Sequence, residues 1–147
     1  MEKTTSFKSE ELFNLNAYNE LLKLASDAAN NGDEDAIEDV ATIKKATDSF
    51  HGYVNTVDMT ETRIKIARFR YESEEYREIV QEADRARRIA HEAAIANASM
   101  LNRIAKFYGI KDPIFLGDTT DRYQVADFCL CVTVALFREA NGGVNDR

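Results

Sequence analysis

The stretch from Glu74 to Tyr108 constrains the fold of this chain most strongly. It contains neither proline nor glycine, and its apolar residues recur at the three- and four-residue spacing that lines one face of a helix. Gly109 follows it, at a position that suits a helix C-cap, and the chain's single proline, Pro113, comes next. The sequence therefore predicts one long helix over 74–108, followed by a loop.

The N-terminal part of the chain predicts a helical hairpin. Two segments with helical apolar spacing flank the sequence NNGD at 30–33, which ends one helix and begins the next. Because the connection is short, the two helices should pack antiparallel. The segment 63–71, RIKIARFRY, alternates apolar and basic residues in part, as a strand would, but no partner strand is evident. We therefore expect helix there, with a break near Ser73.

The C-terminal part predicts a buried helix. Thr119 or Thr120 could cap it, and it should run to about Ala140. It is apolar on nearly all sides, so we expect it to be the most buried element. Together these elements predict an all-α helical bundle with two parts. The first is an acidic N-terminal hairpin at 1–57, and the second is a helical core at 58–147.

Charge is distributed unevenly and restricts the classes of partner. Residues 1–59 carry 5 basic and 12 acidic side chains, whereas residues 60–108 carry 10 basic and 8 acidic ones. A protein that binds nucleic acid generally needs a broad positive surface, which this chain lacks. A local anion site in the middle third stays possible, and the acidic segment could meet a basic partner, including the middle third of a second copy.

Several classes of protein and site are disfavoured by the composition. The longest apolar run, at 128–137, is too short to span a membrane, and the N-terminal residues do not resemble a signal peptide. The two cysteines, Cys129 and Cys131, suit a reducing compartment, so we expect a cytoplasmic protein. With two histidines and no recognisable phosphate loop or metal motif, we expect no metal and no cofactor.

A polar stripe on the long helix is the first candidate site. Arg88, His91 and Asn102 align along one side of the helix, and Arg87 lies beside His91. Arginine suits phosphate or carboxylate, and histidine and asparagine can bind a polar edge. The alternative is a solvated helix face with an Asp84–Arg88 ion pair. Ile95, which interrupts the stripe, suggests that something covers it.

Further polar residues accompany the C-terminal helix. Asp118 and Arg122 are four residues apart, and Asp127 stands among apolar neighbours, where it should be paired with an arginine such as Arg88 or Arg103. A salt bridge that fixes two helices is the favoured interpretation, and a cleft shared by both helices is the functional one. Asn97 falls on the apolar face and should set a helix–helix or dimer contact, or bind the 109–118 loop.

The sequences RRIAHEA, LNR at 101–103 and GDTTDRYQVADF at 117–128 resemble a small bacterial and phage family of unknown function, over about residues 63–137. The resemblance implies no activity, and it leaves the hairpin at 1–57 outside. The residues that match the family's polar positions become candidates for ligand binding. Together with Arg87 they form the candidate set: Arg87, Arg88, His91, Asn102, Arg103, Asp118, Arg122 and Asp127.

The chain also resembles HEPN-type ribonucleases, which are small helical bundles with an arginine a few residues before a histidine. Arg85 and His91 have that spacing, but Ala86 departs from the polar residue that usually follows the arginine. On a straight helix Arg85 and His91 also point about 120° apart. This resemblance would imply a metal-independent ribonuclease with His91 as the general acid or base.

Two functions follow as expectations. The first is a non-enzymatic binding protein for a small anionic, nucleotide-like ligand or a protein partner, which would suit a phage or mobile-element inhibitor of a host system. The second is the ribonuclease. The long helix exceeds what a domain of this size needs, so we also expect a homo-oligomer.

Overall fold

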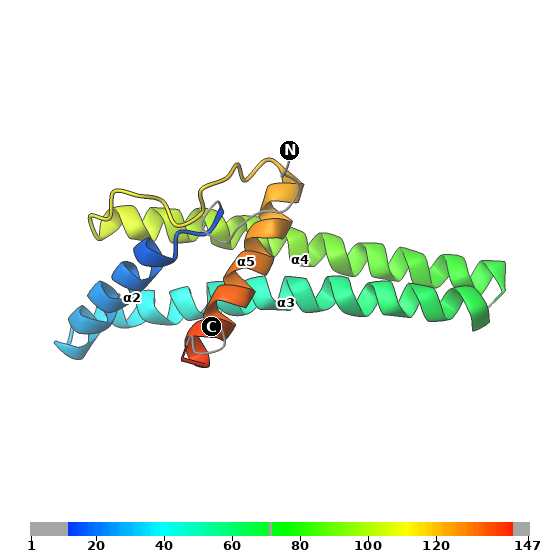
Figure 1. Cartoon of the computed structure of the whole chain (residues 1–147), viewed down its shortest axis with the longest axis horizontal. Helices are drawn as coiled ribbons and strands as arrows, with labels where there is room; N and C mark the ends of the chain where they lie inside the picture. Colours follow the sequence, from blue (N-terminus) through cyan, green and yellow to red (C-terminus); the bar gives the residue numbers. More distant parts are fainter. Residues whose placement is uncertain (1–11, 71, 143–147) are drawn as a thin grey trace.

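Four helices make up the computed structural model, which describes residues 12–70 and 72–142. They are α2 (Leu15–Asn30), α3 (Glu34–Arg70), α4 (Ser73–Phe107) and α5 (Arg122–Ala140). In Figure 1, α3 and α4 form a long antiparallel hairpin, α2 folds back along the first part of α3, and α5 crosses the hairpin near its middle. The all-α bundle that the sequence predicts is confirmed. None of the described helices is long and apolar enough to cross a membrane.

Side-chain caps begin α2, α3 and α5, and a glycine follows the end of α4. The Asn14 side chain accepts a hydrogen bond from the Ala17 N–H (3.0 Å) at the start of α2, and Asp33 accepts one from the Asp35 N–H (3.0 Å) at the start of α3. Gly109, with φ +80°, follows the end of α4, as predicted. The cap of α5 is Asp121, so the prediction of Thr119 or Thr120 is wrong. The Asp121 carboxylate accepts hydrogen bonds from the N–H groups of both Tyr123 and Gln124.

The second helix is longer than the sequence suggested. It runs without a break from Glu34 to Arg70, so the boundary expected between residues 57 and 58 lies inside α3. The segment 63–70 is helical, as expected, and residue 71 lies outside the described residues. In this segment the basic side chains are exposed, whereas Ala67 is buried, which is the pattern of a helix with one covered side.

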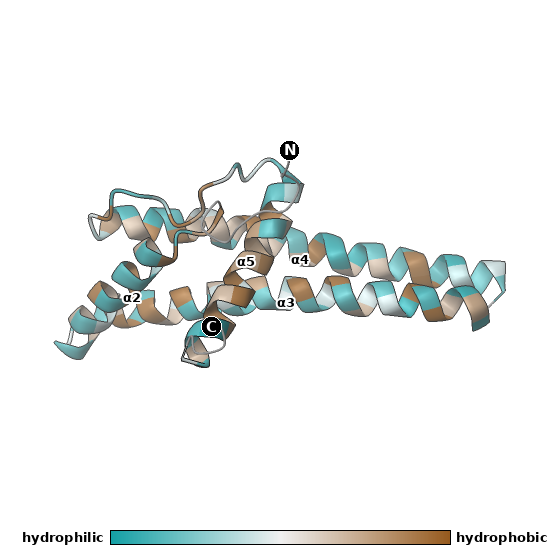
Figure 2. Cartoon of the chain, in the orientation of Figure 1, coloured by the Kyte–Doolittle hydropathy of each residue, from teal (hydrophilic) through white to brown (hydrophobic). Residues whose placement is uncertain are grey.

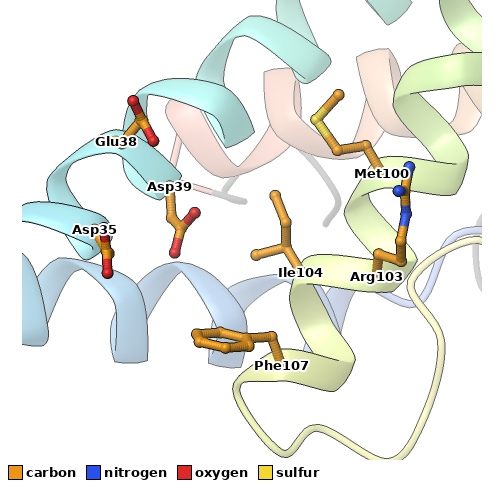
Figure 3. A pocket seen from close by; sticks show the side chains of 7 residues that line it. All are labelled: Asp35, Glu38, Asp39, Met100, Arg103, Ile104 and Phe107. Carbon is orange, nitrogen blue, oxygen red and sulfur yellow. The ribbon is translucent and has the colours of Figure 1, made fainter.

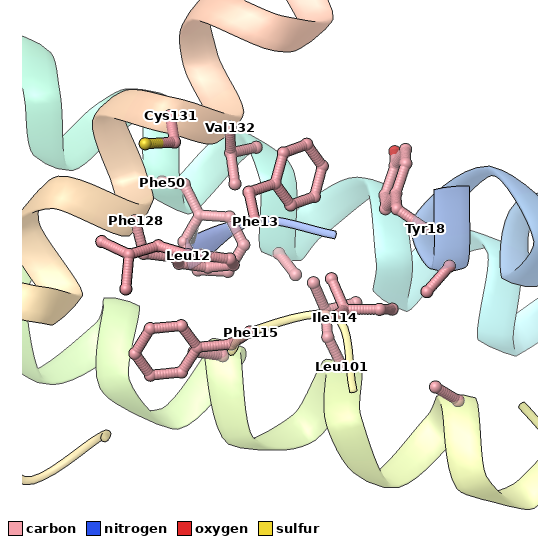
Figure 4. Close-up of a cluster of buried hydrophobic side chains, with 14 of the residues drawn as sticks. Leu12, Phe13, Tyr18, Phe50, Leu101, Ile114, Phe115, Phe128, Cys131 and Val132 are labelled. Carbon is pink, nitrogen blue, oxygen red and sulfur yellow. The ribbon is translucent and has the colours of Figure 1, made fainter. Parts of the chain in front are cut away.

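An aromatic cluster around Phe128 forms the centre of the core (Figure 4). The Phe128 ring lies 5.0 Å from that of Phe50 on α3, 4.6 Å from that of Phe115 and 5.9 Å from that of Phe13, centroid to centroid. These distances suit tilted and edge-to-face ring packing. Residues before and after position 57 therefore share one hydrophobic cluster. Only one side of α5 is buried, because Leu130 and Phe137 on its other side are 49% and 66% exposed.

A half-buried asparagine, Asn102, holds the loop between α4 and α5 in place. The Asn102 side chain accepts hydrogen bonds from the N–H groups of Ile114 (2.8 Å) and Phe115 (3.0 Å) and donates one to the Phe115 carbonyl (3.2 Å). The same loop pairs with the segment before α2, through the bonds from the Asn14 N–H to the Ile114 carbonyl and from the Leu116 N–H to the Leu12 carbonyl. Asn102 thus joins α4 to the segment that carries Phe115 into the core.

The second asparagine of α4 has the structural role that the sequence predicts. The Asn97 side chain donates to the Ser49 hydroxyl of α3 (2.9 Å) and to the Ala93 carbonyl one turn back (2.9 Å). It therefore lies at a helix–helix contact within the chain. The 109–118 loop, the other partner predicted for Asn97, is bound by Asn102 instead.

We expect Asn102→Ala to lower the free energy of unfolding by about 2 kcal/mol, because two N–H groups and a carbonyl lose their partners in a partly buried place. Urea denaturation followed by circular dichroism measures the change. Asn55→Ala is the matched control, since Asn55 is exposed on α3 and contacts only His51. Equal loss in both variants would contradict the role given to Asn102.

Candidate functional site

A polar cleft of about 540 Å³ lies where the start of α5 crosses the hairpin. Helix α4 contributes most of the charged side chains of the cleft. Helices α3 and α5 each supply a tyrosine, and α5 also supplies an arginine. The lining residues are Tyr53, Asp84, Arg87, Arg88, His91, Arg122, Tyr123 and Ala126. Four of the eight candidate residues from the sequence, Arg87, Arg88, His91 and Arg122, therefore meet in one place.

Helical spacing brings the α4 side chains together. Positions 84, 87, 88 and 91 recur at three and four residues and so face the same side of α4. The Arg87 guanidinium donates to the Asp84 carboxylate at 2.9 Å, three residues away. The Asp84–Arg88 pair expected from the sequence is therefore wrong, because Asp84 pairs with the other arginine of the turn. Arg88 is exposed and forms no ion pair with any described residue.

The first turn of α5 supplies a third guanidinium. The Arg122 guanidinium lies over the ring of Tyr123, with its central carbon 5.2 Å from the ring centroid, and donates to the Tyr123 hydroxyl at 3.4 Å. Both side chains are exposed. A cation over an aromatic face is a favourable arrangement that keeps the remaining N–H groups of the guanidinium available to a ligand.

Tyr53 forms the α3 side of the cleft. Its ring lies 5.8 Å from the His91 ring, centroid to centroid, with the two planes tilted by 51°. Burial raises the pKa of the Tyr53 hydroxyl, while the positive charges of Arg87 and Arg122 act in the opposite direction. Arginines of two different helices thus lie close enough to Tyr53 to favour the charged form of its hydroxyl, although burial outweighs them.

The other four candidate residues lie elsewhere. Asn102 holds the loop, as described above, and Arg103 lines a second groove on α4. The Asp118 carboxylate accepts hydrogen bonds from the N–H and the hydroxyl of Thr120, which lower its pKa, and no ion pair joins it to Arg122 among the described residues. These contacts shape the loop before α5 and do not reach the cleft.

Asp127 is half-buried on α5 but is not held by either expected arginine. Within residues 12–70 and 72–142, no ion pair joins it to Arg88 or Arg103. Burial raises the pKa of its carboxyl, and the negative charge of Asp121 raises it further. The salt bridge predicted from the sequence is therefore wrong, because Arg88 lines the cleft and Arg103 lines another groove, and Asp127 lines neither.

Two aromatic residues of the cleft were missed in the sequence. Tyr53 has the spacing of the apolar side of its helix, so no pattern distinguished it from a core residue. Tyr123 directly follows Arg122 in the first turn of a predicted helix, before the apolar run begins, and this position was an available signal. Ile95, the apolar residue that interrupts the polar stripe of Arg88, His91 and Asn102, packs against the hydrophobic core of the chain itself.

Metal chemistry has no support among the described residues. They contain no group of three or more histidine, cysteine, aspartate or glutamate side chains arranged to hold a metal ion. Cys129 and Cys131 are buried and form no disulfide, and burial raises the pKa of the Cys129 thiol to about 12. A thiol with so high a pKa is a poor nucleophile at neutral pH.

Comparison with known proteins assigns the chain to a family. A model of the family described as "Protein of unknown function (DUF3232)" matches residues 3–141. The chain belongs to this family. Searches of curated proteins and of solved structures gave no match. The match confirms the resemblance to a family of unknown function, and it also includes the N-terminal hairpin, which the resemblance had left outside.

We expect Asp127→Asn to stabilise the protein at neutral pH. The raised pKa means that the charged carboxylate is disfavoured in the folded state, and this cost is present above the folded-state pKa. The midpoint of urea unfolding should therefore be higher in the variant at pH 7. The difference should disappear below the ordinary pKa of 3.8, where both side chains are neutral. Asp58→Asn, at an exposed position of α3, is the control and should change little at either pH.

Proposed function

We propose that this chain is a non-enzymatic binding protein that holds a small anionic, nucleotide-like ligand in the cleft between α3, α4 and α5. The observation that carries the proposal is the convergence of three guanidinium groups on a cleft whose described lining contains one carboxylate, Asp84. Because that carboxylate pairs with Arg87, the cleft keeps an excess of positive charge around Arg88 and Arg122. An anion would offset this excess.

The geometry favours a ligand that has both a phosphate and a flat ring. Arginine forms paired hydrogen bonds with phosphate oxygens, and Arg88 and Arg122 approach the cleft from two helices. Tyr53 and Tyr123 offer aromatic faces on which a base could stack, and the His91 ring lies beside Tyr53. His91 can also donate or accept a hydrogen bond from a polar edge.

The proposal also includes the inhibitor role and the protein partner that we expect from the sequence. Capture of a signalling nucleotide would suit a phage or mobile-element inhibitor of a host system. A phosphorylated or acidic segment of a protein partner would use the same arginines, and competition between such a peptide and a nucleotide would distinguish the two. A reducing, cytoplasmic location agrees with two buried cysteines that form no disulfide.

The ribonuclease alternative finds less support. Its arginine, Arg85, is exposed and does not line the cleft that contains His91. The two side chains would need to meet across two copies of the chain to act together. Incubation of the protein with RNA tests this directly, and cleavage that His91→Ala abolishes would replace the binding proposal with the enzymatic one.

We expect Arg88→Gln and Arg122→Gln each to weaken nucleotide binding about tenfold or more, because each removes a charged hydrogen-bond donor worth about 1.5–3 kcal/mol. Isothermal titration calorimetry with ATP, AMP and inorganic phosphate measures the effect and separates the contribution of the base from that of the phosphates. Arg85→Gln is the matched control, since it removes the same charge from α4 outside the cleft.

Three results decide the proposal. Binding of ATP that is weakened by the two cleft variants and retained by Arg85→Gln supports it. Equal weakening in all three variants would show that only the overall charge matters. No heat and no rise in melting temperature with any of the three probes at millimolar concentration would contradict a nucleotide site in this cleft.

A further inference from the structure

A second surface of the hairpin has a different character from the cleft. Along α4, one side carries apolar residues at alternating spacings of three and four from Ala86 to Met100, the pattern of a helix that packs on another helix. Arg103 takes the next position of this pattern, and Phe107 follows it one turn later. Ile89 and Phe107 on this side are 63% and 79% exposed, and Ala93 and Ala96 between them are exposed as well. We call this side the α4 stripe, made up of Ala86, Ile89, Ala93, Ala96, Met100 and Phe107.

The neighbouring side of α3 continues the same surface. Met59 and Ile66 are 71% and 49% exposed, and Gly52 has open space beside its Cα. Near the end of α4, a groove of about 450 Å³ runs between the two helices (Figure 3). Among the described residues, its lining comes from α3 and α4 alone: Asp35, Glu38, Asp39, Met100, Arg103, Ile104 and Phe107. Figure 2 also shows apolar positions along the part of the hairpin that extends beyond α5.

The α4 stripe is separate from the polar cleft. Residues 84, 87, 88 and 91 line the cleft, whereas 86, 89, 93 and 96 fall on the far side of the same turns of α4. One helix therefore presents an arginine-rich side toward α5 and an apolar side away from it. A surface of exposed isoleucine, methionine and phenylalanine costs free energy in water unless a partner covers it.

We propose that this face binds the same face of a second copy of the chain, with the two α4 helices antiparallel about a two-fold axis near Ala93 and Ala96. The central part of the stripe, from Ile89 to Met100, is self-complementary about that point, as a two-fold interface requires. Ala93 meets the partner's Ala96, and Ile89 meets the partner's Met100. The small alanines let the two helices approach closely, and the larger side chains cover them on either side.

Charges at the two ends of the hairpin agree with this arrangement. The Asn97–Ser49 hydrogen bond and the Arg63–Glu82 ion pair (2.7 Å) fix how α3 is aligned along α4 within one chain. With α4 antiparallel to its copy, that alignment brings Glu38 opposite the partner's Arg63. The groove end, with Asp35, Glu38 and Asp39, thus faces the part of the partner that carries Arg63. A parallel pairing would place the three carboxylates of both copies together, which is unfavourable.

Charge variants at the centre of the face test the proposal. Light scattering of the full chain at micromolar concentration should give twice the mass of one chain. A93E/A96E and A93K/A96K should each give the mass of one chain, because like charges meet at the axis. An equimolar mixture of the two variants should return to the doubled mass, because opposite charges then meet. Both positions are exposed, so each variant should keep the circular dichroism of the parent.

Phe137→Glu is the control, since it places a charge on an exposed apolar position of α5 outside the face, and it should leave the doubled mass unchanged. A parent chain with the mass of one chain would overturn the proposal. So would a doubled mass that persists in both charge variants, or variants that stay single when mixed. The first of these results would indicate that a different protein, or another segment of this chain, covers the face.

Discussion

The packing of Phe128 against Phe13, Phe50 and Phe115 is the interaction on which the rest of this structure depends. These four rings come from the segment before α2, from α3, from the loop and from α5. Their contact fixes α5 across the hairpin at one place. The position of α5 then decides where Arg122 and Tyr123 meet the α4 side chains. The cleft is therefore a consequence of the core, although none of its charged residues lies in the core.

A second consequence is that the hairpin is only partly covered. The aromatic cluster and α2 lie over one part of α3 and α4, and the remainder extends past α5 with no other described helix against it. A two-helix element alone buries little apolar surface, and the exposed Met59, Ile66 and Ile89 reflect this. The two sides of α4 thus differ in the kind of partner that they suit. The side toward α5 carries the arginines, and the opposite side carries the apolar stripe that suits a second copy.

The polar residues show which features of the site helical spacing predicts and which it does not. The alignment of Arg88 and His91 on α4 follows from helical spacing alone, so the sequence predicts it correctly. The same reasoning placed Asn102 in the stripe, but its amide is used by the backbone of the loop at 114–115. It also paired Asp127 with Arg88 or Arg103, although these partners lie on parts of α4 that α5 does not bring near Asp127. Periodicity gives the direction of a side chain on its own helix, but it does not say which other element that side chain meets.

By itself, the sequence determined the helical class, the long α4, the break near Ser73, the cap at Gly109 and the grouping of Arg87, Arg88 and His91. All of these depend on residues within a few turns of one another, where backbone preference and spacing decide the outcome. Only the tertiary structure decided that α3 continues to Arg70, that Tyr53 and Arg122 join the α4 arginines, and that Asn102 serves the loop. α3 continues to Arg70 by packing along α4, whereas the other two outcomes depend on where α5 crosses the hairpin. That crossing is set by the packing of aromatic rings far apart in the sequence, which no local pattern records.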